Sequence, residues 1–122
     1  MSRELPLKLQ SSPVAADEVP QCFESDAEPG IIRVRGHLST GSRGWRLHAA
    51  AACRRSVIVM HVTAVELPPG STPDLEYHSY DATIRVHRRG RFHLKVRHGF
   101  RCVGLTGVTL PDPVYEATLA VP

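Results

Sequence analysis

Apolar and polar residues alternate along most of the chain from Ile31 onward, which is the pattern of strands with one buried face. In Arg91–Phe100, for example, Phe92 and Leu94 fall on one side and basic residues on the other. We find no stretch with the period of an amphipathic helix. The alternation predicts strands over Ile31–Leu38, Trp45–Cys53, Val57–Glu66, Tyr80–His87, Arg91–Phe100 and Val114–Val121.

Turn-forming residues separate these stretches, and a chain of 122 residues fits one domain. Six or seven short strands joined in this way predict an all-β fold, an immunoglobulin- or fibronectin-like antiparallel β-sandwich. A small barrel is the competing architecture. Val57–Glu66 is apolar on both faces, so we expect this strand to be central and covered on both sides, or to present its second face to a partner.

Residues 1–30 lack this pattern, because prolines, serines and a glycine interrupt it. Six acidic and two basic side chains give the segment a net charge of −4, whereas thirteen basic and six acidic side chains give residues 31–122 a net charge of +7. Sparse apolar residues offset little of the entropy lost on ordering. We therefore expect residues 1–30 to form an extended acidic N-terminal arm on the sandwich domain of residues 31–122. The arm would lie on a partner or, since its charge is opposite, on its own domain.

The basic residues of the predicted strands fall on one side of each strand, and Lys95 is the one lysine beyond residue 30. Arginine suits planar, bidentate recognition of carboxylate or phosphate. Such rows are candidates for docking on protein subunits with acidic surfaces or on anionic lipid headgroups. The alternative is a solvated charged face that blocks edge-to-edge aggregation. With three arm residues added, the candidate interface comprises Pro13, Pro20, Phe23, Arg33, Arg35, Arg85, Arg91, His93, Lys95 and Arg97.

Other chemistries fit the sequence less well. The aromatic residues of the strands alternate with the basic ones and so point to the core, which disfavours the base stacking of nucleic-acid binding. The seven histidines lack the spacing of a metal site, and no phosphate-binding or nucleophile motif is present. Three cysteines are too few for a disulfide scaffold, although a bridge between Cys53 and Cys102 stays open. The sequence predicts no cofactor, no metal and no enzymatic activity.

The segment Tyr80–Phe100 (YDATIRVHRRGRFHLKVRHGF) resembles a recurring stretch of small bacterial immunoglobulin-like β-sandwich proteins of unknown function. There a Y-x-A-x-I strand is followed by a glycine turn, an aromatic residue and x-L/V-x-V-x-H. The stretches GIIRVRGHLST and VYEATLAVP are similar to the first and last strands of those proteins, so the resemblance covers residues 30–122. These are core patterns, which imply a fold more than a function. Many of the similar proteins are exported and carry a cysteine pair, whereas this chain has GSRGW in place of a turn with proline and cysteine.

An arm, a β-sandwich and the absence of an export signal together favour a role in assembly. We expect a non-catalytic extrinsic structural subunit that clamps or stabilises a larger, membrane-associated complex. Extrinsic subunits of bacterial photosynthetic reaction-centre and light-harvesting complexes are an analogy for that role. A stand-alone binding module for a small ligand, metal or peptide is the alternative. The sequence contains no run of 18 apolar residues, so we expect a cytoplasmic location or a peripheral one on a membrane surface, and the resemblance leaves an exported location open.

Overall fold

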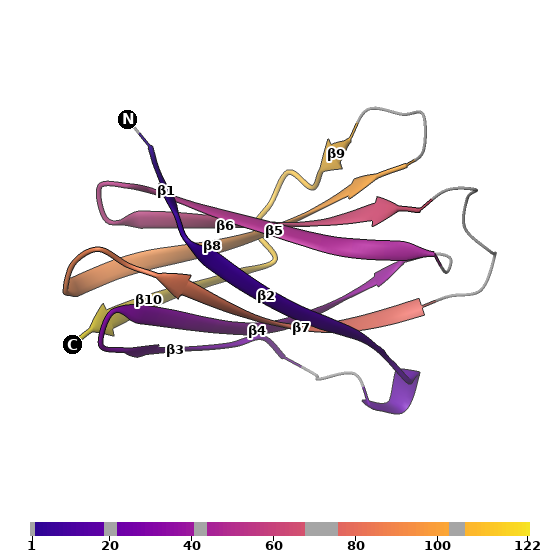
Figure 1. The fold of residues 1–122 in the computed structure, drawn as a ribbon, viewed down its shortest axis with the longest axis horizontal. Helices are drawn as coiled ribbons and strands as arrows, with labels where there is room; N and C mark the ends of the chain where they lie inside the picture. The colour runs from indigo at the N-terminus through magenta and orange to yellow at the C-terminus, as the bar shows by residue number, and fades with distance from the viewer. Residues whose placement is uncertain (1, 19–21, 41–43, 68–75, 103–106) are drawn as a thin grey trace.

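The computed structural model describes residues 2–18, 22–40, 44–67, 76–102 and 107–122. The chain folds into two β-sheets that pack face to face (Figure 1). Sheet A has the strand order β1-β5-β6-β8-β10, with β9 beside β8, and sheet B has the order β2-β7-β4-β3. This architecture confirms the predicted all-β sandwich.

The strand bounds lie within two residues of the predicted ones for residues 31–122, with two exceptions: the strand predicted over Tyr80–His87 spans Glu76–Arg85, and Val108–Thr109 forms a short strand that the alternation does not predict. Sheet A contains β1 (Arg3–Leu5), β5 (Trp45–Arg54), β6 (Val57–Glu66), β8 (Gly90–Arg101), β9 (Val108–Thr109) and β10 (Tyr115–Val121). Sheet B contains β2 (Leu7–Val14), β3 (Glu24–Glu28), β4 (Ile31–Thr40) and β7 (Glu76–Arg85), and a short 3-10 helix, η1 (Ala16–Glu18), follows β2.

Among the described strands, every neighbouring pair is antiparallel except β6 and β8, which run parallel. The exception follows from the path of the chain, because β7, which lies between them in sequence, belongs to the opposite sheet. The parallel register places Val57 of β6 beside His93 of β8, and His61 beside Arg97. The predicted sandwich is therefore antiparallel with one parallel pair at the centre of sheet A.

The N-terminal segment contributes strands to both sheets. β1 pairs with β5, β2 pairs along its whole length with β7, and β3 pairs with β4. Leu5 is only 4% exposed and belongs to the core, and the chain passes from sheet A to sheet B at Pro6. Of the two placements expected for residues 1–30, the structure has the described part of the segment on its own domain, where β1, β2 and β3 belong to the two sheets.

The core lies between the sheets and is built from alternate residues of each long strand. In β8, Phe92, Leu94 and Val96 are fully buried, as the alternation predicts. Their burial from water supplies the main favourable free energy of folding. The largest fully buried residues of the remaining strands are Ile32, Val34, Ile58, Met60, Val62 and Ile84.

Candidate interaction surface

The outer face of sheet B carries arginines with acidic neighbours from the same chain. Arg35 Nε lies 3.5 Å from Asp81 Oδ2, and Arg35 Nη1 lies 3.9 Å from Glu24 Oε2. Arg33 Nη2 lies 3.9 Å from Glu28 Oε2. Glu24 and Glu28 belong to β3, so the acidic N-terminal segment lies against the basic residues of β4. Two residues of the predicted interface, Arg33 and Arg35, thus face internal partners.

The outer face of sheet A carries a basic row on β8, formed by His93, Lys95 and Arg97. Within the described part of the chain, only His93 of this row pairs with an acidic side chain, its Nε2 lying 3.0 Å from Oε1 of Glu116. Arg97 Nη1 donates to the carbonyl oxygen of Pro111 at 3.0 Å. The hydrogen bond with His93, together with the charges of Lys95 and Arg97, lowers the pKa of Glu116. The row retains positive charge after this pairing.

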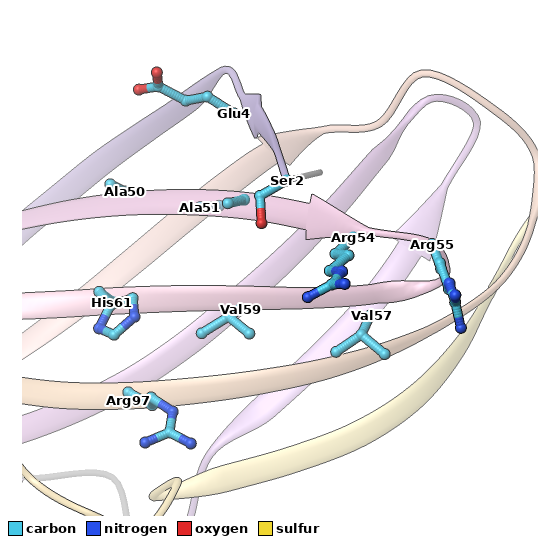
Figure 2. Close-up of a pocket in the computed structure, with 11 residues that line it drawn as sticks. Ser2, Glu4, Ala50, Ala51, Arg54, Arg55, Val57, Val59, His61 and Arg97 are labelled. Atoms are coloured by element: carbon cyan, nitrogen blue, oxygen red, sulfur yellow. The ribbon is translucent and has the colours of Figure 1, made fainter.

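A shallow groove of about 960 Å³ lies on the same face, beside the basic row (Figure 2). Figure 2 shows Val57 and Val59 of β6 projecting to the same side, with Arg97 on the neighbouring strand. The floor also includes Ala50 and Ala52 of β5, and Val57 is 36% exposed. The remaining residues around the groove are Ser2, Glu4, Ala51, Arg54, Arg55 and His61.

The groove tests the expectation for Val57–Glu66, the strand that is apolar on both faces and is expected to be covered on both sides or to meet a partner. β6 is central, between β5 and β8, and Ile58, Met60 and Val62 fill the core on its inner side. On its outer side Val57 is exposed, Val59 is half-buried, and both line the groove. Of the two expectations for this strand, full coverage by described residues is absent, because Val57 and His61 are exposed on the outer side and Val59 is only half-buried there.

The other residues of the predicted interface are spread over the molecule. Pro13 is exposed on β2 and Arg85 is exposed at the end of β7, whereas Arg91 is exposed on β8, two residues before His93 and on the same face as the row. Pro20 lies outside the described residues. Phe23 is half-buried, and its ring packs against other aromatic rings. Only the β8 row of the predicted set is brought together beside the groove.

Sequence reasoning missed the groove itself. The groove joins Ala50, Ala52 and Arg54 of β5 and Arg97 of β8 to the outer face of β6 only through the β5–β6 and β6–β8 registers, which the local alternation does not reveal. The signal that was available is the second apolar face of Val57–Glu66, which pointed to a covered or partnered surface.

A buried polar pair, formed by Tyr80 and His98, lies inside the sandwich. The hydroxyl of Tyr80 and Nε2 of His98 are 2.8 Å apart, and the two residues are 2% and 5% exposed. Burial lowers the pKa of His98 to about 4, and the nearby His37 lowers it as well. Burial also raises the pKa of Tyr80. Both groups are therefore neutral near pH 7, and they satisfy one another away from solvent.

The described residues form neither a metal-binding cluster nor a disulfide bond. No group of three or more His, Cys, Asp or Glu side chains among them is arranged to hold a metal ion. Cys22, Cys53 and Cys102 are free thiols, so the bridge that the sequence left open between the last two is absent. Burial raises the pKa of Cys53, whose Sγ donates to the carbonyl oxygen of Arg55 at 3.2 Å.

Comparison of the chain with protein-family models, with curated proteins and with solved structures gives no match. Among the described residues, no helix has the length and hydropathy needed to cross a membrane. The surfaces described above are therefore the basis for assigning a function.

Proposed function

We propose that the protein is a non-catalytic structural subunit that binds a larger protein complex through the outer face of sheet A. One observation carries the proposal, namely the difference between the two outer faces. Arg33 and Arg35 of sheet B have acidic neighbours within the chain, whereas the β8 row of sheet A lies beside an open, largely apolar groove.

The combination on sheet A has the ingredients of a protein interface. An apolar centre gains free energy when a partner removes it from water. Charged residues around that centre select a partner of opposite charge and accelerate the encounter. Arg97 and Arg54 add the planar guanidinium groups that bind carboxylates in a bidentate manner, and both line the groove.

A finer version of the proposal places this subunit on a membrane-associated complex, where the basic row would also contact anionic headgroups. A bacterial photosynthetic reaction centre with its antenna is one such complex. This version rests on the analogy of role alone. The alternative function, a stand-alone module for a small ligand or peptide, draws on the groove, whose volume lies within the range of ligand pockets.

The test is affinity purification of the tagged full chain from gently solubilised membranes, followed by mass spectrometry. The wild type is compared with the double variant Lys95→Glu, Arg97→Glu and with the control Lys8→Glu, Arg89→Glu. Both control residues are exposed, Lys8 on sheet B and Arg89 in the turn between β7 and β8.

Recovery of the same subunits in fixed ratio with the wild type and the control, but not with the sheet A variant, would support the proposal. Equal recovery with all three chains would contradict the assignment of sheet A as the docking face. Recovery of the protein alone would instead favour the stand-alone module.

A further inference from the structure

We infer that the groove on sheet A binds an extended acidic segment of a partner protein, with a carboxylate at each end and small apolar side chains between them. The inference rests on the proposed function and specifies the chemistry of the partner.

The spacing of two arginines sets the length of the segment. The strand registers place Arg54 beside Val57 and Arg97 beside His61. Figure 2 shows Arg54 near the Val57 end of the groove and Arg97 near the His61 end. From Val57 to His61 the strand rises by about 13 Å, at roughly 3.3 Å per residue. An extended segment with acidic residues four positions apart spans the same rise. It would cross β6 obliquely, because Arg54 on β5 and Arg97 on β8 lie on opposite sides of β6, about 10 Å apart across the sheet, and the two arginine side chains would cover this offset.

The two arginines are free to bind external carboxylates. Neither Arg54 nor Arg97 forms an ion pair with an acidic side chain among the described residues. Arg97 has one nitrogen, Nη1, engaged by the carbonyl of Pro111, which orients the guanidinium and leaves its other donors for a ligand.

The floor between the arginines selects small apolar side chains. Ala52 stands beside Val59, and Ala50 stands beside His61. Alanine leaves room above β5, so the concavity is open over the middle of the groove. Apolar side chains placed there are removed from water, at about 25 cal/mol for each Å² buried.

The charges around the groove favour a peptide over an anionic membrane. Glu4 stands beside Ala52 at one side of the floor, and Glu116 stands beside Lys95 at the other. These carboxylates interrupt the positive charge that a flat anionic surface would contact, whereas a narrow segment can place its two carboxylates on the arginines alone. Both glutamates lie at mid-length, where the apolar part of the segment would pass, so they leave the two ends to the arginines.

The test measures the fluorescence polarisation of a fluorescein-labelled peptide, EAVAE between Gly-Ser linkers, as the full chain is added. A second peptide, KAVAK in the same linkers, has the opposite charge. We expect saturable binding of EAVAE alone, weakened at least about tenfold by Arg54→Glu with Arg97→Glu, because charge reversal replaces attraction by repulsion. Val57→Asp should weaken binding similarly, and the control Lys8→Glu, Arg89→Glu should not. Circular dichroism melting confirms that each variant is folded.

Three outcomes would overturn the inference. These are the absence of saturable EAVAE binding, equal binding of KAVAK, and EAVAE binding that the arginine variant leaves unchanged. Vesicles of phosphatidylglycerol provide a further arm. Arginine-dependent binding to vesicles without peptide binding would replace the peptide by a membrane surface. None of these results decides the proposed function, which fails if assembly is independent of sheet A or if the protein is recovered without partner subunits.

Discussion

The hydroxyl of Tyr80 lies 2.8 Å from Nε2 of His98 and joins the two sheets through the core. Tyr80 belongs to β7 in sheet B, and His98 belongs to β8 in sheet A. Both side chains are buried, so each group replaces the water that the other has lost. The bond therefore contributes to stability and to the relative placement of the sheets.

Replacing Tyr80 by phenylalanine keeps the ring and removes the hydroxyl. Nε2 of His98 then loses its partner inside the sandwich, and we expect a loss of about 1–3 kcal/mol in the free energy of unfolding, the usual cost of a buried unsatisfied group. Urea unfolding at pH 7 measures the change. Tyr77→Phe is the control, because Tyr77 is only half-buried on the same strand. Equal losses in both variants would contradict the assigned role of the bond.

The protein should lose stability as the pH falls from about 6.5 toward 4. Burial, with a contribution from His37, lowers the pKa of His98 from 6.5 to about 4 in the folded state. The unfolded chain therefore binds a proton in this range that the folded chain does not. The contribution is fully present above pH 6.5 and is lost as the pH falls through 4, with a slope of up to about 1.4 kcal/mol per pH unit for each proton.

Urea midpoints at pH 7 and pH 5 measure this slope, and His98→Gln should reduce it. Part of the slope should remain, because burial also lowers the pKa of His78, against the opposing effect of Glu76. Nε2 of His78 lies 3.5 Å from Oε1 of Glu76, at ion-pair distance but with no hydrogen bond from a described residue. His48→Gln on the exposed outer face is the control. A slope that His98→Gln leaves unchanged would refute the prediction.

Gly36 is required where the ring of Phe23 and the hydroxyl of Tyr80 approach β4. A Cβ at position 36 would overlap both groups, so Gly36→Ala must displace Phe23 or break the bond to His98. We expect a loss of about 1–3 kcal/mol, typical of overpacking. Phe23→Leu in the same chain should recover part of this loss, and a double-mutant cycle in urea measures the coupling. Strictly additive effects of the two substitutions would show that Phe23 is not the obstacle.

The long strands could be predicted because their alternation is local. The predicted strand Arg91–Phe100 corresponds to β8 (Gly90–Arg101). Its inward residues, such as Phe92, are buried in the core, and their alternation with polar residues is visible in the sequence of the strand alone. The N-terminal strands could not be predicted in the same way. β2 is an edge strand and tolerates Pro13, and β3 is acidic because its partner β4 supplies Arg33 and Arg35. β1 and β2 pair with strands more than 40 residues away, and no short pattern contains this information, whereas β3 forms a local hairpin with β4 in which acidic residues replace the apolar alternation.

Removing residues 1–14 should unfold the protein. The deletion takes away β1 and β2, exposes the paired edges of β5 and β7, and removes the buried Leu5 from the core. We expect the loss of a cooperative urea transition and of the near-ultraviolet circular dichroism signal. Removing residues 1 and 2 is the control, because both precede β1. A truncated chain that unfolds cooperatively at the wild-type midpoint would show that the segment is a dispensable arm.

The three free thiols should react with Ellman's reagent at different rates. Cys22 is exposed and should react first, whereas Cys53 is 4% exposed and its pKa is raised by burial. The thiolate is the reactive form, so both burial and the raised pKa slow Cys53, and its reaction should follow the opening of the sandwich. Cys22→Ser should remove the fastest phase, and Cys53→Ser should remove a phase that urea accelerates. Reaction of Cys53 as fast as that of Cys22 in the native protein would mean that the edge formed by β1 and β5 opens readily, since Cys53 pairs with Arg3 there.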